Sequence, residues 1–188
     1  TILPGANTTP YHVHTIDITG QTTATINAGI KFSDTRNLTL ADAQTLTIRN
    51  GVAGTDGGIL VTGGTVGTPV SVTVSGGLGI TSGGAGDLVF RTDGPYDTLN
   101  LNTPITAAST GGWTKLGSGT LVLGANNGGT TGGQVHINEG TVKLGIADAD
   151  LGADSLDVRL RQGAALDLNG FNLGTAASGT GSIDELSG

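Results

Sequence analysis

The sequence contains neither cysteine nor methionine in its 188 residues. Without cysteine the chain can form no disulfide and offers no thiol for catalysis or metal binding, so packing and hydrogen bonds must hold the fold together. The absence of methionine, including an initiator at position 1, predicts a processed mature chain or a fragment of a longer one. No run approaches the roughly 20 apolar residues of a membrane-spanning helix, so we expect no direct membrane insertion.

Aromatic and charged residues are also scarce, at 3% and 12% of the sequence. The eight Lys and Arg residues are scattered singly and face fifteen Asp and Glu residues, for a net charge of −7. No basic run could neutralise successive phosphates, so nucleic acid is not an expected partner. Glycine, by contrast, reaches 35 residues. That share is more than twice the roughly 7% average, and it lacks the three-residue period of collagen.

Four-residue segments that alternate between apolar and polar residues recur along the chain. In each segment the apolar residues fall on one face of a β-strand, and the Gly, Asn, Asp and Ser residues between segments favour tight turns. No window has a convincing helical period. The segments are Thr15–Ile18, Asn37–Leu40, Thr45–Ile48, Ser71–Val74, Thr98–Leu101, Thr120–Leu123, Gln134–Ile137, Thr141–Leu144, Asp157–Leu160 and Ala165–Leu168.

The spacing of these segments distinguishes a solenoid from a sandwich. Four similar L-x-L strands begin at Leu99, Leu121, Val142 and Leu166, so their sequence numbers advance by 22, then 21, then 24. Such a period, with several short strands in each interval, is typical of the coils of a β-helix. We therefore predict an all-β, right-handed, single-stranded parallel β-helix of about seven to eight coils, each of roughly 21–24 residues. It is expected to span residues 15–188, after an N-terminal cap or extended arm at residues 1–14, with a weakly ordered end at 175–188.

In such a coil, the apolar residues point inward and stack in columns from coil to coil, whereas the residues between them point outward. Lys143 is then expected beside Asp167 on the outer surface, as an exposed ion pair of small energy. Glycines that precede the strands, Gly119, Gly140 and Gly163, are expected at the corners. The predicted core columns comprise Leu99, Leu101, Leu121, Leu123, Val135, Ile137, Val142, Leu144, Val158, Leu160, Leu166 and Leu168.

From Gly111 to Gly145 the chain reads GGWTKLGSGTLVLGANNGGTTGGQVHINEGTVKLG. This segment resembles the autotransporter-associated β-strand repeat of bacterial passenger domains. That family's pattern is roughly K-x-G-x-G-T-L-x-L, a turn rich in Gly, Asn and Thr, a second strand, and G-T-L-x-L-G. The segment Ala164–Gly174 is similar to the L-D-L-N-G sequence that commonly follows. Asn127–Gly129 stands where the family often has an aromatic residue. The matching residues are Lys115, Gly117, Gly119, Thr120, Leu121, Leu123, Asn126, Gly132, Gly133, Val135, Gly140, Thr141, Val142, Leu144 and Gly145.

The resemblance implies an extracellular or cell-surface location in bacteria and a structural, non-enzymatic role without a cofactor. Two structural hypotheses remain open. The chain is either a stalk or adhesin segment of a passenger domain, which would contact host or matrix surfaces, or a subunit that stacks head-to-tail into fibres. The alternative class is a polysaccharide lyase or hydrolase, or a glycan-binding module, built on a β-helix.

An enzyme of that class needs clustered carboxylates to hold Ca²⁺ or to hydrolyse a glycosidic bond. The one acidic cluster consists of Asp148, Asp150, Asp154 and Asp157, with Arg159 and Arg161 nearby. We interpret this cluster as a solvated loop, because a sugar-binding cleft would be expected to contain aromatic residues.

The other candidate sites also favour structural interpretations. The segments Gly83–Asp87 and Asp93–Asp97 could hold a surface Ca²⁺, but both are first of all turn signals. His12 and His14 would share one strand face, and a Zn²⁺ site would need a third ligand, with His136 remote in sequence. Trp113, the single Trp, could stack on a sugar, but we predict that it lies in the core.

Overall fold

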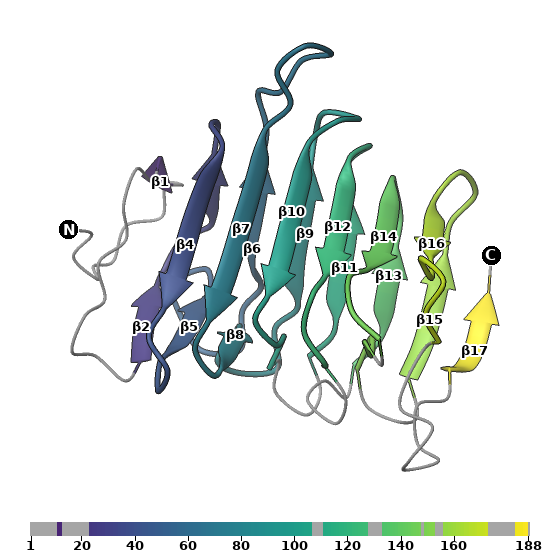
Figure 1. Cartoon of the computed structure of the whole chain (residues 1–188). Helices are drawn as coiled ribbons and strands as arrows, with labels where there is room; N and C mark the ends of the chain where they lie inside the picture. The colour runs from purple at the N-terminus through teal and green to yellow at the C-terminus, as the bar shows by residue number, and fades with distance from the viewer. Residues whose placement is uncertain are drawn as a thin grey trace.

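The computed structural model describes residues 11–12, 23–106, 111–127, 133–147, 149–152, 156–172 and 183–187, of which the side chains at 11, 12, 156 and 183–187 are not placed. All regular structure in these residues is β-strand, and every pairing between strands is parallel. The strands stack as a β-solenoid (Figure 1). The predicted fold class is therefore confirmed. The expected strand Thr15–Ile18, most of the arm at 1–14 and most of the segment 175–188 lie outside the described residues.

The strands form three sheets, and the chain passes through them in turn. The eight-stranded sheet comprises β1 (Tyr11–His12), β3 (Ile30–Phe32), β6 (Gly57–Val61), β9 (Leu88–Thr92), β11 (Trp113–Leu116), β13 (Val135–Ile137), β15 (Leu156–Leu160) and β17 (Ile183–Ser187). The six-stranded sheet comprises β4 (Arg36–Leu40), β7 (Ser71–Gly76), β10 (Thr98–Asn102), β12 (Thr120–Leu123), β14 (Thr141–Leu144) and β16 (Ala165–Asp167). The three-stranded sheet comprises β2 (Thr23–Ile26), β5 (Thr45–Ile48) and β8 (Gly79–Thr81).

Each strand pairs with the strand one coil further along, so residues of similar chemistry lie side by side. Leu99 pairs with Leu121, Leu121 with Val142, and Val142 with Leu166. On the outer face, Lys143 lies opposite Asp167, and their Nζ and Oδ2 atoms are 3.7 Å apart. Because both side chains are more than a third exposed, the pair contributes less than about 1 kcal/mol.

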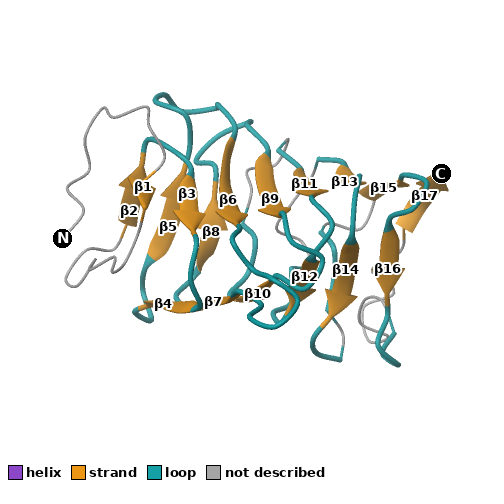
Figure 2. Cartoon of the chain, turned by 90° about the horizontal axis from the view of Figure 1, so that it is seen from above, coloured by secondary structure: helices purple, strands orange, loops and turns teal. Residues whose placement is uncertain are grey.

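A single apolar core lies between the two larger sheets, which form opposite walls of the solenoid (Figure 2). The predicted column residues on β10, β12, β13 and β14, together with Val158 on β15, are at most 1% exposed. Each fully buried Leu or Val stabilises the fold by roughly 1.5–3 kcal/mol. The column becomes less buried at the last coil: Leu160 and Leu166 are half-buried, and Leu168 is 43% exposed. Leu168 is therefore not a core residue: it follows the end of β16, which is the outermost strand of its sheet among the described residues.

The described residues make about five complete turns rather than the predicted seven to eight. The difference arises because the first coils are longer than the C-terminal period. Trp113 and Val135, paired across neighbouring coils, differ in sequence number by 22, whereas the pair Ile30 and Ile59 differs by 29 and the pair Arg36 and Val72 by 36. Loops between the N-terminal strands account for the additional length, including residues 62–70.

Candidate functional site

The corner between the eight-stranded and six-stranded sheets contains a buried lysine, Lys115, on β11. Its strand neighbours in register are Phe90 and Ile137, both of which belong to the core. Lys115 therefore occupies an inner position by strand alternation, and its side chain is fully buried. A lysine at such a position requires hydrogen-bond acceptors for its ammonium group.

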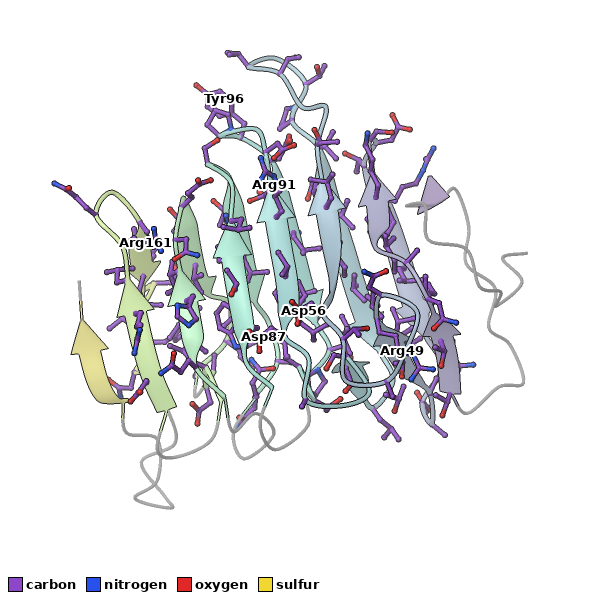
Figure 3. All side chains as sticks on the ribbon, turned by 180° about the vertical axis from the view of Figure 1, so that it is seen from behind. Arg49, Asp56, Asp87, Arg91, Tyr96 and Arg161 are labelled. Carbon is purple, nitrogen blue, oxygen red and sulfur yellow. The ribbon has the colours of Figure 1, made fainter. Side chains whose placement is uncertain are left out.

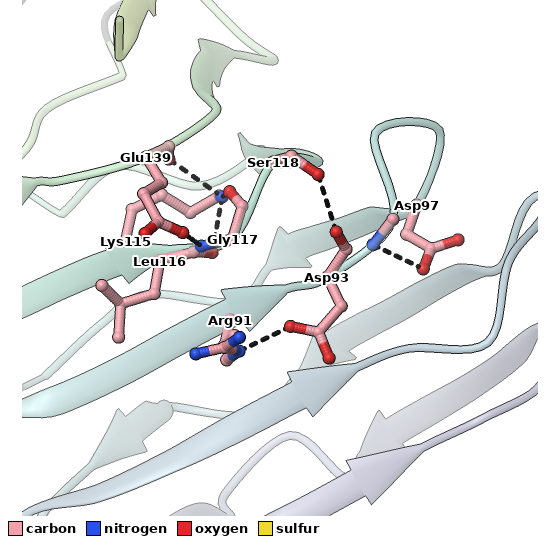
Figure 4. A network of polar contacts seen from close by, with 9 residues as sticks. Arg91, Asp93, Asp97, Lys115, Leu116, Gly117, Ser118 and Glu139 are labelled. Atoms are coloured by element: carbon pink, nitrogen blue, oxygen red, sulfur yellow. Dashed lines mark hydrogen bonds and ion pairs between the residues drawn. The ribbon is translucent and has the colours of Figure 1, made fainter. Parts of the chain in front are cut away.

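Three backbone carbonyls receive the hydrogen bonds of this ammonium group (Figure 4). Lys115 Nζ donates to the carbonyl oxygens of Leu116 at 2.8 Å, Gly117 at 2.6 Å and Glu139 at 3.2 Å. The Glu139 carboxylate completes the corner, because its Oε2 accepts the N–H of Gly117 at 2.8 Å. Glu139 lies in the equivalent turn of the next coil, so these contacts fasten two successive corners together.

The chemistry available to Lys115 follows from this enclosure. Burial lowers the pKa of Lys115 to about 8, an effect that Glu139 opposes and Arg91 reinforces. A lysine with such a pKa is often a base or nucleophile in an active site. Here, however, the side chain is inaccessible to solvent, and its donors are directed at backbone carbonyls. Lys115 therefore has a structural role in this conformation: its hydrogen bonds hold two successive corners together.

Asp97 holds a neighbouring part of the same corner. Its buried carboxylate accepts the N–H groups of Val70 at 3.0 Å, Gly94 at 3.2 Å and Gly64 at 3.4 Å. These contacts fasten the projecting loop 62–70 to the turn Asp93–Asp97, which was a candidate Ca²⁺ site. The other carboxylate of that turn, Asp93, forms an ion pair with Arg91. Both carboxylates therefore have partners within the chain.

Asn127 replaces backbone pairing on the third side of the solenoid. The three-stranded sheet ends at β8, after which only an isolated bridge joins Ile80 to Ile105 in the described part of this side. The buried Asn127 side chain then continues the connection: Oδ1 accepts the N–H of Ile105 at 2.7 Å, and Nδ2 donates to the carbonyl of Asp150 at 2.8 Å. One amide thus connects three successive coils, at the turn where the autotransporter-type repeat often has an aromatic residue.

Trp113 lies in the core, and its ring has no solvent exposure for stacking on a sugar. Its ring centroid is 6.3 Å from that of Phe90 in a tilted arrangement, which aromatic pairs favour. The indole Nε1 donates to the carbonyl of Leu151 at 2.9 Å, so the one polar atom of the ring is satisfied.

The three corner glycines are required for different reasons. A Cβ at Gly119 would lie 2.4 Å from the carbonyl oxygens of Gly94 and Asp97, so close packing excludes a side chain. Gly140 combines a φ of +68° with similarly close carbonyls of the preceding corner. Gly163 has a φ of +86° but open space around it, so it is required by its backbone conformation alone.

The predicted acidic cluster is only partly visible, because Asp148 and Asp154 lie outside the described residues. Asp150 Oδ1 accepts the N–H of Gly152 at 3.4 Å, and Asp157 Oδ2 accepts the side-chain amide of Gln134 at 3.2 Å. His14 and the side chain of His12 are likewise outside the description, whereas His136 lies on β13. Within the residues the structure describes, no three His, Asp or Glu side chains are placed to hold a metal ion.

The other candidate Ca²⁺ segment, Gly83–Asp87, takes part in hydrogen bonds between successive coils. Asp87 Oδ1 accepts the N–H of Gly112 at 2.7 Å, and Asp56 Oδ1 accepts the N–H of Asp87 at 2.9 Å. Each carboxylate therefore binds the backbone of the following coil, at the start of the strands of the eight-stranded sheet.

Comparison with protein-family models, with curated proteins and with solved structures finds no match. The fold confirms only the coarser part of the resemblance to the autotransporter repeat: the described residues of the segment Gly111–Gly145 belong to coils of a parallel β-solenoid. Among the described residues, no helix has the length and apolar character needed to cross a membrane.

Proposed function

We propose that the chain is a structural element of a bacterial surface or secreted protein, and that the coil itself serves as a rigid rod. The observation that carries this proposal is the continuity of the stack. One apolar core extends from Ala24 to Val158 without interruption between coils. A parallel stack of this kind resists bending, because each coil packs against both of its neighbours.

The buried polar groups support the same proposal. Lys115, Asp97 and Asn127 each direct their polar atoms at backbone groups and connect separate coils or corners. None of the three has solvent access of more than 1%. Catalytic groups must reach a substrate, whereas these groups stabilise the coil, so we propose a non-enzymatic role.

The six-stranded sheet has a charged residue at its N-terminal end, which counts against stacking of separate copies. In the described residues its outermost strands are β4 and β16. Arg36 on β4 pairs in register with the core residue Val72, so a charge lies at the end of an apolar column, where Asp34 Oδ2 is 3.7 Å away. A charge at such a position opposes the addition of another strand. Head-to-tail stacking remains the second structural hypothesis, for which the half-buried Leu166 provides an apolar surface at the opposite end.

Sedimentation velocity over a wide concentration range, together with electron microscopy, tests the rod proposal. We expect a single monomeric species with the frictional ratio of a short rod. Filaments at high concentration would favour head-to-tail stacking instead.

The rival enzymatic hypothesis has its own test. Incubation with acidic and neutral polysaccharides, with and without Ca²⁺, is expected to release no product. Release that disappears in Asp150→Ala or Asp157→Ala would refute the non-enzymatic role.

A further inference from the structure

The outer face of the eight-stranded sheet carries several cations that strand register places in line. Although the chain as a whole is acidic, four of its eight Lys and Arg residues are on this face: Lys31, Arg91, Arg159 and Arg161. Strand register aligns Lys31, Leu60, Arg91 and Leu116 on successive strands. Backbone hydrogen bonds to the carbonyls of Lys115 and Ile137 continue the line to Asn138 and Arg161. The outer row therefore consists of Lys31, Leu60, Arg91, Leu116, Asn138 and Arg161.

The three cations of the outer row are widely spaced. Lys31 and Arg91 are two strands apart, and Arg91 and Arg161 are three strands apart. At about 4.8 Å for each strand, these intervals are roughly 10 and 14 Å. Half-buried leucines, Leu60 and Leu116, lie between the cations. A nucleic-acid duplex carries far denser charge, one for each stretch of about 1.7 Å along its axis, so most of its phosphates would find no partner here.

A groove of about 310 Å³ adjoins the first part of this row. Its lining includes Gly29, Gly58, Leu60 and Val89, with Lys31 and Arg91 beside them and Asp56 also contributing. Figure 3 shows Arg91 and Arg161 towards one margin of this face, and Asp56 and Asp87 towards the other. The volume is at the lower limit of small-molecule sites, which suits one sugar ring with an apolar face.

Among the glycines that line the groove, Gly29 is the one that neither close packing nor backbone conformation requires. A Cβ at Gly58 would lie 2.2 Å from the carbonyl oxygen of Val89, so that glycine is required for packing. A Cβ at Gly29 would meet only the carbonyl oxygen of Gly58, at an ordinary 3.5 Å, and Gly29 has no positive φ. The effect of glycine at position 29 is to leave the groove open.

The acidic groups near the outer row are engaged in contacts within the chain. Asp93 pairs with Arg91 itself, and because this pair is exposed, a polymer carboxylate at Arg91 has to share or replace that contact. Glu139 accepts the N–H of Gly117, and Asp56 accepts the N–H of Asp87. Lys31, in contrast, has no side-chain hydrogen bond or ion pair with any described residue. At physiological salt, charges more than about 8 Å away are largely screened, so the net charge of −7 does not prevent an anion from approaching these cations.

We infer that the outer row binds one strand of a linear acidic polysaccharide running along the solenoid axis. Carboxylates spaced along the polymer contact Lys31, Arg91 and Arg161, and the apolar face of an intervening sugar packs in the groove against Leu60 and Val89. This binding goes beyond the rod function, and either one can fail without the other.

Affinity electrophoresis tests this inference with two acidic probes, hyaluronan and polygalacturonate, and with neutral dextran as the control. We expect the acidic polymers to retard the protein, increasingly so at low salt, and dextran to have no effect. Each exposed charge contact contributes up to about fivefold in affinity. If each lost contact weakens binding about two- to fivefold, the triple variant Lys31→Gln, Arg91→Gln, Arg161→Gln should bind roughly 10- to 100-fold more weakly.

Two further variants distinguish this site from diffuse charge attraction. Lys143→Gln removes the same charge from the outer face of the six-stranded sheet and should change affinity less than about twofold. Gly29→Leu fills the groove without altering the charge and should weaken binding. Circular dichroism and thermal unfolding of every variant test whether it is folded. The inference is overturned if neither acidic polymer retards the wild type, or if Lys143→Gln weakens binding as much as the triple variant does. It is also overturned if duplex DNA binds as tightly as the acidic polymers and the triple variant weakens that binding equally.

Discussion

Replacing Lys115 by Met tests how much the buried lysine at the solenoid corner stabilises the fold. Met has a similar length and no charge, so it fills the inner position without leaving a large cavity. The substitution removes the donor from the carbonyls of Leu116, Gly117 and Glu139. A buried acceptor left without a donor costs roughly 1–3 kcal/mol. The loss is partly offset because the variant no longer buries a charge, so we expect a net cost of about 2 kcal/mol at pH 7.

The cost should grow as the pH rises. The pKa of Lys115 falls from 10.5 to about 8 in the folded protein, so between these values the unfolded chain binds the proton and the folded chain does not. The free energy of unfolding of the wild type therefore rises with pH in this window. Below pH 8 both states are protonated and the contribution is constant. From pH 7 to pH 10 the increase is about 2.5 kcal/mol, and the Met variant lacks it.

Urea denaturation of both proteins at several pH values measures this difference. Lys143→Met, which removes an outward-facing lysine, controls for the loss of a surface cation. The reasoning is refuted if the cost of Lys115→Met stays constant from pH 7 to pH 10, or if it falls. A constant cost would mean that the ammonium group is solvated in the folded protein, and a falling cost would mean that folding raises the pKa of Lys115 instead of lowering it.

Three other substitutions have consequences that thermal or urea unfolding can measure. Asn127→Ala removes the amide that connects three coils and should cost about 2–4 kcal/mol, because the buried N–H of Ile105 loses its acceptor; a cost below about 0.5 kcal/mol would contradict this role. Asp97→Ala should cost at least about 2 kcal/mol and should expose the loop 62–70 to proteolysis, since three N–H groups lose their acceptor; unchanged proteolysis would argue against anchoring by Asp97. Gly140→Ala should cost more than Gly163→Ala, for which backbone strain alone predicts about 1–2 kcal/mol; equal costs would show that the close carbonyls at Gly140 do not matter.

The register of the C-terminal half could be predicted from sequence because the signal there is simple. The L-x-L segments have an unambiguous period of two, and their nearly constant spacing leaves little freedom in the alignment. Once Leu121 is placed opposite Val142 and Leu166 follows, the outer pair Lys143–Asp167 is determined as well. Local pattern and coil length therefore agree in this part of the chain.

Other strands gave no comparable signal. Strands β6 and β8 begin with glycine, and β11 places Lys115 at an inner position, where a hydrophobicity pattern expects an apolar residue. The loop 62–70 lengthens one N-terminal coil. The 21–24-residue spacing of the C-terminal strands, from which the number of coils was predicted, therefore does not apply there. For Lys115, a signal was present: Trp113 and Lys115 are two residues apart and share one strand face.

The polar connections between coils could not be predicted from one sequence. Asn127 and Asp97 lie in segments rich in turn residues, where Asn and Asp are ordinary. Their partners, Ile105 and Val70, are 22 and 27 residues away, and that relation becomes visible only when the coils are stacked. The outer row is hidden in the same way, because its cations are scattered in sequence and aligned only by strand register.

The most direct test of the account measures distances along the outer column of the six-stranded sheet. Strand register places Asn37, Thr73, Asn100, Val122, Lys143 and Asp167 on successive strands. The native sequence has no cysteine, so pairs of introduced cysteines can carry spin labels without interference. With one label at position 37 and the other at 122, 143 or 167, the separations should be about 14, 19 and 24 Å, an increase of about 4.8 Å per coil. Separations that do not increase in this order would contradict a parallel solenoid with one strand of this sheet in each coil.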